Sequence, residues 1–127
     1  MQVLIIDDET SIRNSMSEFF DDFGIVVTAV GSAEAALETL KDHTFDVAVV
    51  DIRLPGIDGD ALIVKAHNIS PNLRFIIHTG SVEYRLNDAL REIGLRSEHI
   101  FIKPVVDLSS LVNAAQKLAS QTEQEAP

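Results

Sequence analysis

Five polar residues stand at or just beyond the ends of short apolar runs in the 127-residue chain: Asp7, Asp8, Asp51, Thr79 and Lys103. A carboxylate beside a buried segment is costly unless a cation pairs with it. Three carboxylates brought together would also repel one another without a cation between them. A threonine hydroxyl and a lysine ammonium add hydrogen-bond donors and a positive charge. Together these residue types would form a site that holds a cation beside an anionic group.

The chemistry that suits this set of groups best is phosphoryl transfer to a carboxylate. Ligand sets made only of oxygen favour hard divalent cations, and magnesium binds through a few carboxylates, usually beside a phosphate. An aspartate can itself act as the nucleophile and become an aspartyl-phosphate. Lys103 would neutralise charge on the transferring group, and Thr79 would hydrogen-bond one of its oxygens. Asp51, which follows the apolar run Val47–Val50, is therefore predicted to accept a phosphoryl group beside magnesium.

Five apolar runs must bring these residues together, and each run is rich in Val, Ile or Phe. They are Val3–Ile6, Ile25–Val30, Val47–Val50, Phe75–Ile77 and Ile100–Ile102. Runs of this kind are typical of strands that are buried on both faces. Between them, apolar residues recur at helical spacing in residues 12–23, 86–93 and 108–118. Residues 58–68 are ambiguous because Ala61–Val64 is apolar on every side.

The alternation of strands and helices predicts an α/β fold: a five-stranded parallel sheet, doubly wound (flavodoxin-like), with helices on both faces. Ser32 and Asp107 are expected helix N-caps, and Gly24 and Gly94 are expected helix ends. In such sheets, ligands bind outside the carboxyl ends of the strands. Because the five polar residues all stand at those ends, we expect them to converge on one edge of the sheet.

The composition limits the class of protein. With 46% hydrophobic and 24% charged residues, a chain of 127 residues is expected to form one globular domain. We expect this domain to span residues 1–120, and residues 121–127 to be a polar tail or the start of a linker. The absence of cysteine excludes disulfides, thiolate metal ligands and cysteine nucleophiles. The apolar runs are too short to cross a bilayer, and no basic region of a signal peptide follows Met1. We therefore expect a cytoplasmic location without membrane association.

The remaining charged and titratable residues give no sign of a second site. The net charge of −10, from 20 acidic and 10 basic residues, argues against direct binding of nucleic acid by this domain, because phosphate backbones need clustered Lys and Arg. Much of the acidity serves solubility. The histidines lack metal-ligand spacing, and we expect them at the surface or at strand edges. They are His43, His67, His78 and His99.

Four motifs occur in the order, and on the predicted strands, of a known family: "LIIDDE", "VVDIRLPGIDG", "HTG" and "IKP". Over roughly residues 2–120 the chain resembles a response-regulator receiver domain of two-component signalling. The resemblance implies that Asp51 is the phosphoacceptor and that a histidine kinase or phosphotransfer protein supplies the phosphoryl group. It also implies an output domain or a downstream protein that responds to phosphorylation.

The resemblance further assigns metal ligands and one feature of the backbone. Asp8 and Asp51 would ligate Mg²⁺ directly, and Asp7 would do so mainly through water. The backbone carbonyl of Arg53 would complete the protein ligands. Before phosphorylation, the three aspartates are expected to crowd together without a fixed cation, and hence to bind magnesium weakly. The family usually has a cis peptide at the position of Lys103–Pro104.

The switch is expected to differ from the family pattern in two places: at Ile100, and in the stretch "IGLRSEHIFIKP", which is slightly longer than the usual family connection. By resemblance, Lys103 pairs with the phosphoryl group and Thr79 moves to hydrogen-bond it. Receiver domains commonly carry Tyr or Phe three residues before this lysine, where the chain has Ile100, and Phe101 would face the opposite side of the strand. The displacement of Thr79 is therefore expected to pass into the following loop and into a helix that begins near Glu83.

Two other functions stay open at the level of the sequence. One is a magnesium-dependent aspartate-nucleophile phosphohydrolase, although those enzymes place the nucleophile in a DxD pattern after the first strand, where this chain reads "DDET". The other is a receiver-like binding module that is no longer phosphorylated, against which the intact set of Asp51, Thr79 and Lys103 argues. We expect no enzymatic activity beyond self-phosphorylation from a donor and autodephosphorylation.

Overall fold

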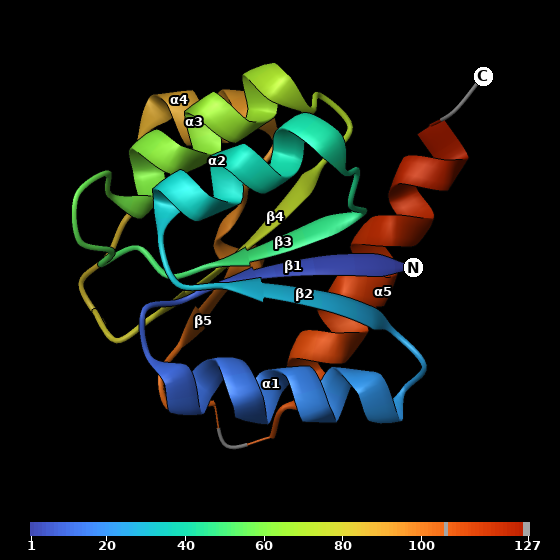
Figure 1. Ribbon diagram of the computed structural model, residues 1–127. Coiled ribbons are helices and arrows are strands. Elements are labelled where there is room, and N and C mark those ends of the chain that lie inside the picture. The colour runs from blue at the N-terminus through green and yellow to red at the C-terminus, as the bar shows by residue number, and fades with distance from the viewer. Residues whose placement is uncertain (106, 126–127) are drawn as a thin grey trace.

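Five parallel strands form one sheet in the order β2-β1-β3-β4-β5 (Figure 1). The computed structural model describes residues 1–105 and 107–125. The strands are β1 Gln2–Ile6, β2 Val26–Val30, β3 Val47–Val50, β4 Arg74–Thr79 and β5 Ile100–Ile102. All four pairings between neighbouring strands are parallel. The predicted five-stranded, doubly wound α/β fold is confirmed.

Helices cover both faces of the sheet, with α1 and α5 on one side and α2, α3 and α4 on the other (Figure 1). They are α1 Thr10–Asp22, α2 Ala33–Asp42, α3 Gly59–Ile69, α4 Asp88–Ile93 and α5 Ser109–Glu125, with a short 3₁₀ helix η1 at Ser97–His99. Of the ambiguous residues 58–68, Asp58 is the N-cap of α3 and the others belong to this helix. Helix α5 runs on past residue 120 to Glu125, and residues 126–127 lie outside the described part, so a boundary at residue 120 stays a prediction.

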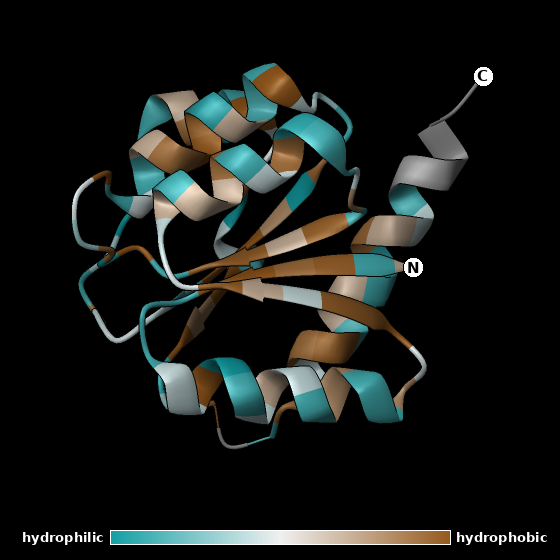
Figure 2. Ribbon diagram, viewed as in Figure 1, coloured by the Kyte–Doolittle hydropathy of each residue, from teal (hydrophilic) through white to brown (hydrophobic). Residues whose placement is uncertain are grey.

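The strands divide the core into two layers by their period of two. Alternate residues such as Ile6, Val50 and Ile77 pack beneath α2, α3 and α4. Their neighbours, such as Ile5 and Val49, pack beneath α1 and α5. Figure 2 shows the resulting hydrophobic centre of the sheet between helices that carry both hydrophobic and hydrophilic residues. The two layers bury the central strands between them, and this packing positions the residues at the carboxyl ends of the strands.

Local signals set most of the helix ends. The Ser32 hydroxyl accepts a hydrogen bond from the Ala35 N–H at 3.1 Å, which confirms the expected N-cap of α2. Asp107 accepts from the Ser109 N–H at 3.0 Å, where α5 begins. Gly24 follows α1 with φ +75°, and Gly94 follows α4 with φ +120°, a region that glycine enters without steric cost.

Two expectations about these elements are wrong. Strands β2 and β5 are not buried on both faces, because they lie at the two edges of the sheet, where Val26 is 59% and Ile102 is 38% exposed. Helix α4 begins at Asp88 rather than near Glu83, because the Asn87 side chain caps it by accepting from the Leu90 N–H at 2.9 Å. The segment between β4 and α4 is therefore a loop. Across the described residues, no helix is long and apolar enough to span a membrane.

Candidate functional site

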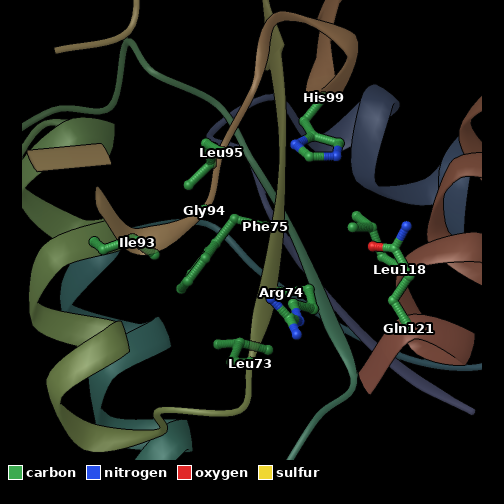
Figure 3. A pocket seen from close by; sticks show the side chains of 9 residues that line it. All are labelled: Leu73, Arg74, Phe75, Ile93, Gly94, Leu95, His99, Leu118 and Gln121. Carbon is green, nitrogen blue, oxygen red and sulfur yellow. The ribbon is translucent and has the colours of Figure 1, made fainter. Parts of the chain in front are cut away.

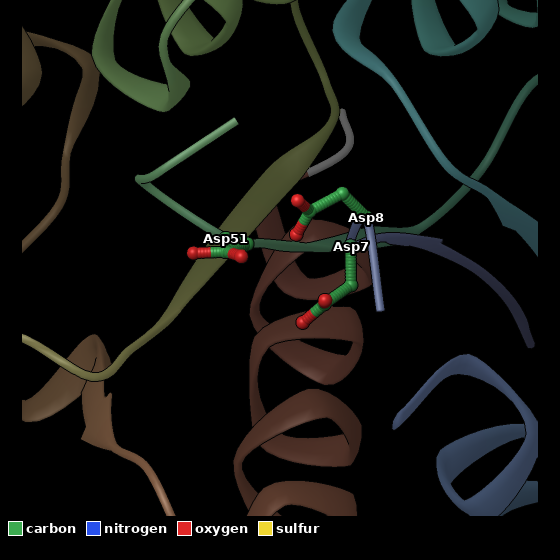
Figure 4. A group of neighbouring side chains, drawn as sticks. All are labelled: Asp7, Asp8 and Asp51. Carbon is green, nitrogen blue, oxygen red and sulfur yellow. The ribbon is translucent and has the colours of Figure 1, made fainter. Parts of the chain in front are cut away.

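The carboxyl ends of β1 and β3 place three aspartates together (Figure 4). These neighbouring strands are joined where the Asp51 N–H donates to the Ile6 carbonyl at 2.9 Å. One carboxylate oxygen from each of Asp7, Asp8 and Asp51 lies within 4.8 Å of the others. Asp7 is 2% exposed and Asp51 is 5% exposed, whereas Asp8 faces solvent. The predicted convergence of these residues on one edge is confirmed.

Lys103 enters this acidic cluster from the end of β5. Its Nζ lies 2.8 Å from Asp7 Oδ2, 3.3 Å from Asp51 Oδ2 and 3.6 Å from a Glu9 carboxylate oxygen. The expectation that the aspartates crowd together without a fixed cation is therefore wrong. Burial lowers the pKa of Lys103, but the hydrogen bonds and charges of Asp7 and Asp51 together raise it above its ordinary value. The ammonium therefore stays protonated and offsets the repulsion between the two buried carboxylates.

The second oxygen of each buried carboxylate is held by the backbone. Asp7 Oδ1 accepts from the Glu9 N–H at 2.9 Å, and Asp51 Oδ1 accepts from the Arg53 N–H at 3.0 Å. In each case the chain turns back directly after the strand, so the turn itself orients the carboxylate. The Arg13 guanidinium holds the first of these turns by donating to the Asp7 carbonyl at 2.7 Å. Both buried carboxylates are thus fixed in place before any ligand binds.

The glycine of the "IDG" sequence allows α3 to begin against the turn that follows Asp51. A Cβ atom at Gly59 would lie 2.6 Å from Ile52 Cα and 2.7 Å from the Asp51 carbonyl oxygen. The Gly59 N–H donates to the Ile52 carbonyl at 2.9 Å. Because real Cβ atoms do not approach backbone this closely, only glycine fits here without displacing the turn.

Three carboxylates at one edge fit a hard divalent cation, because such ions prefer oxygen ligands. Asp8 stands on the solvent side of the cluster, where an ion would enter. The Arg53 side chain is exposed, and its backbone follows Asp51 by two residues. The assignment of its carbonyl as a ligand stays a prediction.

Thr79 lies at the end of β4, fully buried, and is connected to Lys103 through the backbone. The Lys103 N–H donates to the Thr79 carbonyl at 2.8 Å, and the peptide bond from Lys103 to Pro104 is cis, as expected. The Thr79 hydroxyl accepts from the Ser81 N–H at 3.1 Å. The structure therefore brings Thr79 to the edge of the site with its hydroxyl engaged by the loop that follows.

His78 lies beside the site, and the expectation that it lies at the surface or at a strand edge is wrong. It is only 5% exposed, and within the described part of the chain neither ring nitrogen has a hydrogen-bond partner. Burial lowers its pKa, the positive charge of Lys103 adds to this effect, and Asp7 and Asp51 oppose it. Ile76 faces α1 and α5, and the period of two along a strand places His78 on the same face. This period is the signal in the sequence that predicts the burial of His78. Of the other histidines, His43 is exposed, and His67 and His99 are half-buried.

Because His78 is held neutral, we expect it to make folding less favourable in mild acid. Its pKa is lower in the folded chain than the ordinary 6.5, so the unfolded chain takes up the proton first as the pH falls. Above pH 6.5, His78 is neutral in both states and leaves the free energy of unfolding unchanged. Below pH 6.5, protonation of His78 in the unfolded chain lowers this free energy. Urea unfolding at pH 7.5 and 5.5 measures this. The free energy of unfolding of the variant His78→Leu should fall less between the two pH values than that of the wild type, and equal falls would refute the prediction.

A separate small cavity lies at the other end of β4, between the loop after α4 and helix α5 (Figure 3). Its lining includes Arg74, Gly94 and Leu118, and its volume is about 40 Å³. A cavity of this size holds about one or two waters. It is too small for a substrate, and its lining includes none of the three aspartates.

Residues 3–116 match the model of the family described as "Response regulator receiver domain". The chain belongs to this family. Receiver domains are phosphoaccepting signalling switches and are generally not enzymes. The acidic pocket of Asp7, Asp8 and Asp51, together with Lys103, gives this chain the site of such a switch.

Relatives and solved structures agree with this assignment. Sporulation initiation phosphotransferase F of Bacillus subtilis (strain 168) is 28% identical over 116 residues, which are 91% of each chain. A CheY-like receiver domain protein from Methanospirillum hungatei JF-1 superposes with a TM-score of 0.85 at 26% identity, over 98% of each chain. The response regulator TrrA from Thermotoga maritima, solved in complex with Mg²⁺ and BeF, gives a TM-score of 0.79 at 21% identity, over 92% of this chain and 97% of that one.

The curated relatives differ in how much lies outside the matched region. The chain spans 91% of the length of the Bacillus phosphotransferase, but 57% of the transcriptional regulatory protein FixJ of Bradyrhizobium diazoefficiens. It spans 17% of the C4-dicarboxylate transport regulator DctD of Rhizobium meliloti (strain 1021). Receiver domains therefore occur among these relatives both nearly alone and as part of longer proteins.

Proposed function

We propose that Asp51 accepts a phosphoryl group from the phosphohistidine of a histidine kinase or phosphotransfer protein, in a reaction that requires magnesium. The observation that carries this proposal is the place of Asp51: a buried carboxylate that faces the Lys103 ammonium at 3.3 Å and shares one pocket with Asp7 and Asp8. The family assignment supports the general chemistry. We propose, beyond this general chemistry, which residue is modified, which metal is bound and which donor supplies the phosphoryl group.

In the proposed step, a carboxylate oxygen of Asp51 attacks the phosphorus of the donor. The O–P bond forms as the P–N bond breaks, and the donor imidazole, which carries a proton on its other ring nitrogen, leaves as the neutral ring. Asp7, Asp8, Asp51 and the Arg53 carbonyl would hold magnesium, which supplies positive charge to the transferring group. Lys103 exchanges part of its contact with Asp51 for a phosphoryl oxygen, and Thr79 donates its hydroxyl to another.

The proposal also covers the metal, the extent of the domain, the location and the output. The structure of TrrA was solved in complex with Mg²⁺ and BeF. Because both chains share the fold, this complex supports magnesium as the metal here. We place the domain at residues 1–120 and the protein in the cytoplasm, with output through an attached domain or a separate protein. Chemistry is confined to self-phosphorylation from a donor and autodephosphorylation.

Intact mass spectrometry tests this proposal on the whole chain. Incubation with a small phosphodonor and magnesium should add one phosphoryl group per molecule, and a chelator should prevent the gain. Free phosphate should be released no faster than the aspartyl-phosphate decays, whereas a phosphohydrolase would turn over many donor molecules. A gain that persists undiminished in the chelator would contradict a metal-dependent reaction. No gain in either condition would favour the binding-module alternative.

Magnesium binding before phosphorylation should depend on Asp8, the carboxylate that faces solvent beside the Lys103 pair. A ligand that binds only the folded state raises its stability. At magnesium tenfold above its dissociation constant, we expect the melting temperature to rise by about 3 to 6 °C. The variant Asp8→Ala should lose most of this rise, while Asp22→Ala, at the exposed end of α1, should keep it. A rise of equal size in Asp8→Ala would place the metal elsewhere.

A further inference from the structure

Tyr84, the only tyrosine of the chain, connects two segments that follow the site. It lies in the loop between β4 and α4, and its hydroxyl donates to Asp60 Oδ1 at 2.6 Å across 24 residues of sequence. Asp60 stands in the first turn of α3, the helix that follows the Asp51 turn. This hydrogen bond therefore joins the segment after Thr79 to the segment after Asp51.

The surroundings of Tyr84 and Asp60 stabilise the hydrogen bond between them. Tyr84 is half-buried and its ring packs against the core layer beneath α2, α3 and α4. Burial, the hydrogen bond to Asp60 and the negative charges of Asp60 and Asp58 all raise the pKa of the Tyr84 hydroxyl. The hydroxyl therefore keeps its proton at neutral pH and remains a donor. A hydrogen bond to an ionised acceptor is stronger than one between neutral groups.

A short series of hydrogen bonds links Tyr84 to Thr79. The Tyr84 N–H donates to the Ser81 carbonyl at 3.3 Å, and the Ser81 N–H donates to the Thr79 hydroxyl oxygen at 3.1 Å. Movement of Thr79 toward Asp51 would break its bond with Ser81 and disturb the turn that carries Tyr84. One turn thus carries both the Tyr84 ring and the N–H that holds the Thr79 hydroxyl.

A groove beside the loop offers the ring an alternative position. It lies between the loop and β5, has a volume of about 490 Å³, and is lined by Val82, Tyr84, Leu86, Arg91, Ile100 and Ile102 among others. A cavity of roughly 150 Å³ is sufficient for benzene. Because Ile100 and Ile102 are aliphatic, no aromatic ring of β5 competes for this space.

We propose that the hydrogen bond from Tyr84 to Asp60 holds the loop in its unphosphorylated arrangement, and that Tyr84 leaves Asp60 for the groove beside Ile100 when Thr79 turns toward phosphorylated Asp51. The inference rests on the proposed function. It makes Tyr84 a positioning residue, which acts on the reaction through Thr79. The bond stabilises one of two arrangements, and its loss shifts the population toward the other.

Tyrosine fluorescence tests the release directly, because the chain has one tyrosine and no tryptophan. A tyrosine ring emits weakly when its hydroxyl is hydrogen-bonded to a carboxylate, so release of Tyr84 from Asp60 should raise the tyrosine emission. Magnesium with beryllofluoride is the probe. We expect emission of the wild type to rise on its addition, and emission of Asp60→Ala to be high from the start and to change little. Equal emission of the wild type and Asp60→Ala, with and without the probe, would overturn the proposal.

Phosphorylation kinetics provide the second test. Tyr84→Phe keeps the ring and removes only the hydroxyl, so uptake from a small phosphodonor should become about fivefold to tenfold faster. The double variant Tyr84→Phe/Asp60→Ala should be no faster than either single variant, because both remove the same bond. Glu83→Gln changes an exposed charge on the same loop and should leave the rate as it is. A Tyr84→Phe rate equal to that of the wild type would overturn the inference and leave the proposed function standing. Absence of uptake in every chain would overturn both.

Discussion

Asp51→Asn should take up no phosphoryl group from a small phosphodonor and magnesium, a loss of at least about a thousandfold in rate. An amide has no carboxylate oxygen with which to attack phosphorus, and it removes one negative charge from the pocket that would hold the metal. The side chain keeps its shape, and its oxygen can still accept from the Arg53 N–H. The loss should therefore occur without loss of the fold. Uptake kinetics followed by intact mass measure the effect.

Asp46 provides the matched control for this substitution. It immediately precedes β3, at the end opposite Asp51, and its carboxylate accepts from the Gln2 N–H at 2.8 Å. Asp46→Asn therefore removes the same charge at the opposite end of the same strand, away from the site. It should be phosphorylated at the wild-type rate. Equal uptake by Asp51→Asn and the wild type would remove Asp51 from the role assigned to it.

Lys103→Met should produce the second large effect, on stability as well as on chemistry. Without the ammonium, the buried carboxylates of Asp7 and Asp51 lose their ion pairs with Lys103, and we expect the free energy of unfolding at pH 7 to fall by about 3 kcal/mol. Phosphoryl uptake should slow about a hundredfold, because one of the groups that neutralises the transferring charge is gone. Denaturant unfolding and uptake kinetics measure the two effects.

Magnesium separates the electrostatic explanation from simple loss of packing. If the carboxylates of Asp7 and Asp51 destabilise Lys103→Met, added magnesium should restore more stability to this variant than it adds to the wild type. Lys41→Met is the control, since that lysine pairs with Glu38 on the exposed surface of α2, where such pairs contribute little. A Lys103→Met chain as stable as the wild type without magnesium would show that the ion pairs do not offset the repulsion.

The positions of the three aspartates were predictable because they depend on regular features of the chain. Apolar runs identified β1 and β3, and parallel strands share one carboxyl edge, so Asp7 and Asp51 had to meet there. The order of side chains along a strand also separated Ile100 from Phe101, which pack on opposite faces of the sheet. Period and strand direction were sufficient for these predictions.

Other features depend on side-chain direction or distant contacts, for which the sequence carries no local signal. The long side chain of Lys103 reaches across from β5 to Asp7, 96 residues away, so its pairing in the absence of a phosphoryl group was missed. The bond between Tyr84 and Asp60 depends on the path of a loop without regular structure. The start of α4 at Asp88 is set by the Asn87 cap, and this asparagine is a signal that the sequence does carry.

The most direct test of the central claim identifies the phosphorylated atom by chemistry. Borohydride reduces an aspartyl-phosphate to homoserine with release of phosphate, and the converted position can then be located by peptide mass spectrometry. We expect homoserine at position 51 alone, in chains treated with phosphodonor and magnesium and not in chains treated with a chelator. Homoserine at position 7 or 8, or a stable phosphoryl group on a serine, threonine or histidine, would contradict the account of Asp51 as the phosphoacceptor.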